Sequence, residues 1–122
     1  MSDPAAPEGA KKLVIDVGLN SQSLHISPEI YVRILQKAVQ QTSKDLQDLG
    51  GALPLNDYEK VKAISHKLKG DYDNLRITEM SSIAKEINKL AAVGQDKERS
   101  ADLINEFSHY FDQLKSFVGQ QS

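Results

Sequence analysis

Apolar residues recur every three or four positions along most of the chain after residue 27, which is the spacing of amphipathic helices. The first such stretch begins at Ser27-Pro28, because serine is a good N-cap and proline suits the first helical position. Gly50 and Gly51 are predicted to end this helix, since glycine readily adopts the left-handed conformation found at helix C-termini. The apolar stripe of this predicted helix consists of Tyr31, Ile34, Leu35, Ala38, Val39, Thr42, Leu46 and Leu49.

The same spacing predicts three further helices. The second runs from about Asn56 to about Asn74, with Asn56 or Asp57 as its N-cap, and its stripe is Tyr58, Val61, Ile64, Ser65, Leu68, Tyr72 and Leu75. The third starts at Thr78 and ends at Gly94, and its inner face is Met80, Ile83, Ala84, Ile87, Leu90 and Ala91. The fourth starts near Asp96 and has the strongest pattern, with Leu103, Ile104, Phe107, Tyr110, Phe111, Leu114, Phe117 and Val118.

Four amphipathic helices joined by short connections predict an all-α fold, an antiparallel up-down-up-down four-helix bundle with a short N-terminal extension. Residues 1–11 are small, polar and proline-containing, so we expect a disordered tail there and a single domain over residues 12–122. The stretch from Leu13 to Val17 could be a strand or a half-turn lying over the core. The fold class alone does not identify a function, because bundles host many chemistries.

Composition narrows the possible functions. The chain has 122 residues, no cysteine and a formal net charge of −2. The lack of cysteine excludes a disulfide scaffold, a cysteine-ligated metal site and a thiol nucleophile. The charge argues against nucleic-acid binding. No signal peptide or membrane span is visible, which predicts a cytoplasmic protein without a membrane partner, and the tail that begins at Met1 favours a free-standing one.

The chain has three histidines, and only one lies in a suggestive setting. His25 and His109 are expected to be surface residues. His66 points away from the apolar stripe of the second predicted helix, on a polar stripe made of Glu59, Lys62, His66, Lys69, Gly70 and Asp73.

The residues one turn beyond His66 suggest a chemistry. Gly70 inside a helix costs about 0.5–1 kcal/mol relative to alanine, and a close approach by another molecule is one reason to keep it. Lys69 can supply a cation to a bound anion, and an exposed imidazole with a pKa of about 6.5 is nucleophilic at neutral pH. This arrangement indicates a phosphoryl-accepting histidine. The alternative is a solvated histidine on a lysine-rich helix.

The segment Ala63-Ile64-Ser65-His66-Lys67-Leu68-Lys69-Gly70 resembles the motif of histidine phosphotransfer (HPt) domains, in which the active histidine is followed by x-Leu-Lys-Gly. Asn74-Leu75 and the segment 82–88 extend the resemblance, which covers roughly residues 13–118. It implies that His66 carries a phosphoryl group on Nε2, that Lys69 contacts this group, and that Gly70 lets a receiver domain approach.

The resemblance also implies a role for Asn88, which matches an amide residue, often glutamine, that orients the imidazole in several members. Because asparagine is shorter by one methylene, Asn88 could equally be an ordinary surface amide. Three residues depart from the family pattern. Asp71 and Tyr72 replace small residues, and Tyr72 is expected to fill core space. Arg76 replaces a glycine at the end of the helix, which could therefore end differently.

The resemblance implies receiver domains of response regulators or hybrid histidine kinases as partners. A receiver aspartate would give its phosphoryl group to His66, which would pass it to another receiver. The chain would then be a carrier and no enzyme, without a cofactor of its own, and the Mg²⁺ would belong to the receiver. Lys62, Lys67 and Asp73 are predicted partner-binding residues, and apolar side chains of the first helix are candidates for docking.

Two other functions remain open at this stage. One is a binding module that sequesters a receiver without accepting a phosphoryl group, a hypothesis that the charge of Asp71 keeps open. The other is a haem carrier that uses His109 and Met80, which requires both residues to face the bundle interior.

Overall fold

Five helices make up most of residues 12–94 and 96–121, the part of the chain that the computed structural model describes. They are α1 (Val17–Ser23), α2 (Pro28–Ala52), α3 (Tyr58–Asn74), α4 (Thr78–Val93) and α5 (Lys97–Gln120). No strand occurs in these residues. The predicted tail, residues 1–11, lies outside the described part.

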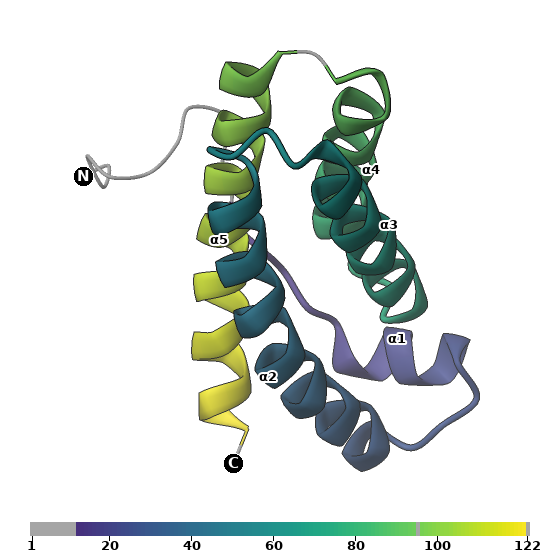
Figure 1. Cartoon of the computed structure of the whole chain (residues 1–122). Coiled ribbons are helices and arrows are strands. Elements are labelled where there is room, and N and C mark those ends of the chain that lie inside the picture. The colour runs from purple at the N-terminus through teal and green to yellow at the C-terminus, as the bar shows by residue number, and fades with distance from the viewer. Residues whose placement is uncertain (1–11, 95, 122) are drawn as a thin grey trace.

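The four long helices form the predicted bundle. Helix α2 packs against α3 and α5, and α4 likewise packs against α3 and α5. Successive long helices run in opposite directions, so α3 lies with one side toward α2 and another toward α4 (Figure 1). This confirms the all-α bundle expected from the sequence, because each helix needs two neighbours to cover its apolar stripe.

The N-terminal extension contains a short helix that the sequence pattern left undecided. Residues 12–16 have no regular structure, and α1 then begins with Asp16 as its N-cap, whose Oδ1 accepts a hydrogen bond of 2.9 Å from the backbone N–H of Leu19. Helix α1 packs against α2 and lies across one end of the bundle (Figure 1). Asn20 and Ser21 are buried there. Since its buried residues are mainly polar, α1 has no apolar stripe that periodicity could detect.

The glycine pair at positions 50–51 does not end α2, contrary to the prediction. Both glycines are helical, and the chain reverses instead at Asn56, which has φ +58°. The N–H of Asp57 donates to the carbonyl of Ala52 at 3.0 Å across this reversal. Asparagine tolerates the left-handed conformation, so the turn needs no glycine.

The other predicted helix ends agree with the structure, with one exception. Asp57 caps α3 through a 3.2 Å bond from the N–H of Lys60, and Asp96 caps α5 through a 3.0 Å bond from the N–H of Arg99. Gly94 ends α4 with φ +61°. The exception is Thr78, which is the first residue of α4 and does not cap it, because Ile77 occupies the N-cap position without a side-chain hydrogen bond.

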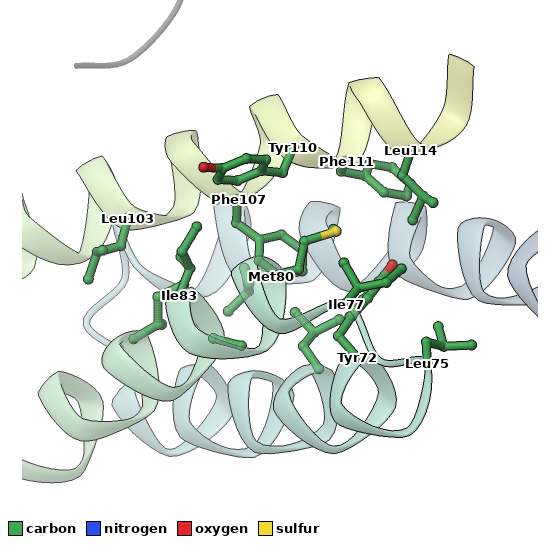
Figure 2. Close-up of a cluster of buried hydrophobic side chains, with 14 of the residues drawn as sticks. Tyr72, Leu75, Ile77, Met80, Ile83, Leu103, Phe107, Tyr110, Phe111 and Leu114 are labelled. Carbon is green, nitrogen blue, oxygen red and sulfur yellow. The ribbon is translucent and has the colours of Figure 1, made fainter. Parts of the chain in front are cut away.

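The core lies where the aromatic face of α5 meets α3 and α4 (Figure 2). The rings of Tyr72 and Phe107 pack edge to face with centroids 5.7 Å apart. The Tyr72 hydroxyl and the Thr42 hydroxyl share a 2.7 Å hydrogen bond, and burial raises the pKa of Tyr72. Tyr72 therefore fills core space, as predicted. Ile34 was expected on the inner face of its helix but is 41% exposed, because it borders a groove between α1, α2 and the end of α3.

A buried hydrogen-bond chain joins three helices at the end of the bundle that α1 covers. The hydroxyl of Tyr31 on α2 donates to the backbone carbonyl of Leu75, directly after α3. The Nδ2 atom of Asn20 on α1 donates to the same hydroxyl at 3.0 Å. Burial raises the pKa of Tyr31. The position of α1 and the end of α3 therefore depend on one tyrosine.

We predict that Tyr31→Phe destabilises the protein by about 1–3 kcal/mol, because a buried carbonyl and a buried amide each lose a partner. Urea unfolding followed by circular dichroism measures this change. Tyr58→Phe is the matched control, since the Tyr58 hydroxyl makes only an exposed contact of 3.5 Å with Asn56. Equal unfolding midpoints for the two variants would contradict the structural role of Tyr31.

Candidate functional site

His66 lies in the middle of α3, on the side of the helix that faces away from the core. Val61, Ser65, Leu68 and Tyr72 bury the opposite side of α3. The imidazole is exposed, and it makes no hydrogen bond or ion pair with any residue of the described part. The surroundings of His66 therefore leave its imidazole free to act as a nucleophile. The helix that carries it is anchored through its opposite face.

Lys69 and Asp73 are brought together on the same polar stripe, one and two turns beyond His66. Their Nζ and Oδ2 atoms lie 3.1 Å apart. The Ser81 hydroxyl on α4 and the Lys69 ammonium lower the pKa of Asp73 below its usual value. Lys85 of α4 contributes to the same effect. Sequence reasoning missed Lys85, although the outward face of the third predicted helix contains it.

Gly70 is exposed beside His66, and a Cβ atom built at this position meets no atom within 4 Å outside the helix's own backbone. Neither packing nor backbone conformation in this chain requires a glycine there, since its φ is that of an ordinary helical residue. The helix therefore accepts an unfavourable residue where the surface next to the histidine is open.

Asn88 shares a shallow surface groove with His66, together with Glu59, Lys62 and Ala63. Its Nδ2 atom donates to the backbone carbonyl of Lys62 at 2.9 Å, and not to the imidazole. The Ser65 hydroxyl donates to the same carbonyl at 3.1 Å. In an α-helix this carbonyl also accepts the N–H of His66. Asn88 thus ties α4 to the turn of α3 that carries His66, and its predicted role in orienting the ring stays a prediction.

Lys67 is held in an ion-pair cluster between α2 and α3. Its Nζ atom lies 2.6 Å from Oδ2 of Asp45 and 3.4 Å from Oδ2 of Asp71. The bond to Asp45 is the main cause that raises the pKa of Lys67. The charge of Asp71, a departure from the family pattern, is offset by this lysine. Lys62 forms no ion pair among the described residues, so it is the freer of the two predicted partner-binding lysines.

Arg76 ends α3 in the way that the glycine of the family pattern is expected to do. It adopts φ +63°, the N–H of Ile77 donates to the carbonyl of Tyr72 at 3.0 Å, and its own N–H donates to the carbonyl of Asp73 at 3.1 Å. These two bonds form a Schellman motif. The guanidinium also donates to Ser23 on α1 at 3.1 Å. Arg76 thus ends α3 in a left-handed conformation, and bonds from its side chain to Ser23 and to the carbonyl of Asp73 accompany this backbone.

The other two histidines lie elsewhere. His25 is exposed and ends α1 with φ +59°. His109 is half-buried, less exposed than expected, in a groove beside Leu13 and Phe117. Met80 is fully buried in the core (Figure 2). His109 and Met80 do not meet in the bundle interior, so the arrangement needed for the haem hypothesis is absent from the described residues.

Among residues 12–94 and 96–121, no group of three or more His, Cys, Asp or Glu side chains is placed to hold a metal ion. No helix in this part of the chain is both long enough and apolar enough to cross a membrane.

Comparison with known families decides what the bundle is. The family model described as the Hpt domain matches residues 33–117, which include all of α3 and α4. The chain belongs to the Hpt domain family. Hpt domains are histidine phosphotransfer domains of phosphorelays, and they interact with receiver domains as carriers rather than kinases.

A solved structure has the same fold as this Hpt domain. The crystal structure of histidine-containing phosphotransfer protein B (HptB) from Pseudomonas aeruginosa PAO1 superimposes with a TM-score of 0.76. The alignment covers 93% of this chain and 96% of that chain at 22% sequence identity. Similarity at this level shows the fold. A search of curated protein sequences found no match.

We predict that Lys67 contributes to stability through Asp45. A double-mutant cycle with Lys67→Met and Asp45→Asn, measured by urea unfolding, should give a coupling free energy of about 0.5–1 kcal/mol, the upper range for partly exposed pairs. Glu86 and Lys89, an exposed pair on α4 separated by 3.7 Å, provide the control cycle, with a smaller coupling. A coupling no larger than that of the control would mean that Lys67 is free for other contacts.

Proposed function

We propose that His66 is the phosphoryl-accepting residue of this Hpt domain, and that it takes the group from a receiver-domain aspartate and passes it to another receiver. The observation that carries this proposal is an exposed imidazole without a partner in the middle of α3, followed by Lys69 and by a glycine at position 70 that nothing in the chain requires. His25 and His109 have no such neighbours.

The proposed step needs no base from this chain. In the neutral ring with the proton on Nδ1, the lone pair of Nε2 attacks phosphorus, and the bond between phosphorus and the receiver's carboxylate oxygen breaks. The electron pair of that bond leaves with the aspartate carboxylate, while Nδ1 keeps its proton. Because the imidazole of His66 is exposed and has no partner among the described residues, its Nε2 lone pair is available for this attack.

Lys69 and Gly70 support this step in different ways. The ammonium of Lys69, one turn from the ring, can offset negative charge on the phosphoryl oxygens as they approach. Gly70 leaves room for the receiver to bring its phosphoaspartate close to Nε2. We propose that the Mg²⁺ required for the reaction is held by the receiver, which makes this chain a carrier without catalytic machinery of its own.

The receiver is proposed to dock over α3 and the adjoining part of α2. Ile30 and Ile34 on α2 are 45% and 41% exposed, and Ile34 borders a groove with Leu24 and Ile26. Such apolar surface can supply docking energy, while Lys62 can steer an acidic partner and speed the encounter. Apolar docking residues on the first long helix are what the sequence led us to expect.

The alternative is that the same surface binds a receiver without accepting a phosphoryl group. The charge of Asp71 was the feature that favoured this function, and the ion pair between Asp71 and Lys67 offsets that charge. The two functions differ in one result, because a pure binding module binds receivers equally well after His66→Ala and never forms phosphohistidine.

The proposal is tested with a receiver domain carrying a labelled phosphoryl group. Acid-labile, base-stable label should appear on the wild-type chain and be lost in His66→Gln. His25→Gln and His109→Gln are matched controls that should accept label at the wild-type rate. Labelling of His66→Gln at the wild-type level would refute the assignment.

We further predict that Gly70→Ala increases the stability of the protein but slows phosphoryl transfer. Alanine should stabilise α3 by about 0.5–1 kcal/mol, since its Cβ atom meets no other group. The same methyl group should slow transfer from a receiver by tenfold or more, because the donor has to pass close to the backbone at this position.

Gly50→Ala is the control for this prediction. Gly50 is also helical, a Cβ atom at this position would also meet no other group, and the residue lies near the C-terminal end of α2. It should raise the unfolding midpoint without changing the transfer rate. Thermal unfolding and the rate of receiver-dependent labelling measure the two effects. Unchanged transfer in Gly70→Ala would contradict the role of Gly70 in receiver approach.

A further inference from the structure

Lys69 already has a partner before any phosphoryl group arrives. Its ammonium lies 3.1 Å from the carboxylate of Asp73, and the two side chains are 38% and 50% exposed. The ion pair therefore lies at the surface, one turn beyond His66 on the same stripe of α3. A phosphoryl group on His66 and the carboxylate of Asp73 would compete for one cation.

The position of Asp73 is unfavourable for the helix itself. Asp73 is the residue before the last in α3, where the helix dipole disfavours a negative charge. Its order relative to Lys69, with the cation nearer the N-terminus, is the weaker of the two orders for pairs four residues apart. Helix stability thus gives no reason for a carboxylate here, and the pair opens at little cost.

A second helix contributes to the surroundings of the carboxylate, although the Ser81 hydroxyl itself donates to the carbonyl of Thr78 at 3.1 Å. Ser81 of α4 lies beside Asp73, and its hydroxyl is the first cause of the lowered pKa of Asp73, followed by Lys69. The charge of Lys85 on α4 contributes to the same lowering of the pKa of Asp73. When Lys69 leaves, Asp73 keeps Ser81 as a neighbour and remains ionised.

We infer that Asp73 is a positioning residue that binds Lys69 while His66 is unphosphorylated and releases it to the phosphoryl group afterwards. Because Asp73 competes for Lys69, the chain retains the phosphoryl group less strongly. The inference rests on the proposed function of His66. It assigns Asp73 a task in transfer, because a carrier has to release its group as readily as it accepts it. An Hpt domain without a carboxylate at this position would bind the phosphoryl group more strongly.

The experiment uses the full chain and phosphoramidate, a small donor that transfers a phosphoryl group to histidine without a receiver domain. Phosphorus NMR follows the formation and the decay of phosphohistidine. Asp73→Asn should increase the rate of formation and the lifetime by about two- to fivefold, the range expected for one exposed charge interaction. Asp73→Glu should restore the wild-type values.

Two comparisons isolate the cause. Asp112→Asn removes the same charge from an exposed ion pair on α5, and should leave both rates unchanged. In a Lys69→Met background, Asp73→Asn should have no further effect, because the cation that it competes for is gone. Unfolding midpoints of all variants confirm that each is folded.

The outcomes separate the two proposals. If the wild type forms no phosphohistidine at His66 with phosphoramidate or with a phosphorylated receiver, the proposed function fails, and the inference fails with it. If His66 is phosphorylated normally but Asp73→Asn behaves as the wild type, only the role of Asp73 is wrong. An effect of Asp73→Asn that persists in the Lys69→Met background would also overturn it.

Discussion

The burial of one face of α3 between its neighbours is the constraint on which the rest of the structure depends. Val61, Ser65, Leu68 and Tyr72 all lie on this face and are fully buried. A helix anchored in this way has a fixed rotation about its axis, so its polar stripe is held outward as a unit. The exposure of His66 follows from the packing on the opposite side and needs no separate support.

Contacts at the C-terminal end of α3 and along two of its sides then fix the site. Tyr31 holds the carbonyl after α3, Asn88 holds the carbonyl one turn before His66, and Lys67 joins α3 to Asp45 on α2. Each of these groups acts on the backbone or the flank of α3 and leaves the imidazole free. The result is a helix held from several sides that presents an exposed imidazole.

Several features of this arrangement could be predicted from the sequence alone. Helical periodicity identified the buried faces of all four long helices, and the caps at Asp57, Gly94 and Asp96 depend on local chemistry that the sequence displays. The polar stripe around His66 follows from the same periodicity. The end of α2 was misplaced because Gly50 and Gly51 can be helical, and only the packing of the turn at Asn56 decides where the chain reverses.

The remaining features depend on contacts between helices, which the periodicity of the sequence does not reveal. Helix α1 was missed because its place is fixed by Asn20 and Tyr31 rather than by an apolar stripe. The lysines near His66 look alike in sequence, yet Lys67 is bound by Asp45 of α2. The sequence left Asn88 open between a residue that orients the imidazole and an ordinary surface amide, and its bond to the Lys62 carbonyl depends on the distance between α3 and α4. Such pairings can be seen only once the helices are placed.

The central claim is that one exposed ring nitrogen, Nε2 of His66, carries the phosphoryl group. The most direct measurement is nitrogen NMR of the chain labelled with ¹⁵N-histidine, recorded before and after loading with a small phosphoryl donor. The account predicts that one imidazole changes, that it is the signal missing from His66→Gln, and that its Nε2 resonance shows coupling to phosphorus. Phosphorus coupling on His25 or His109, with the His66 signals unchanged, would contradict it.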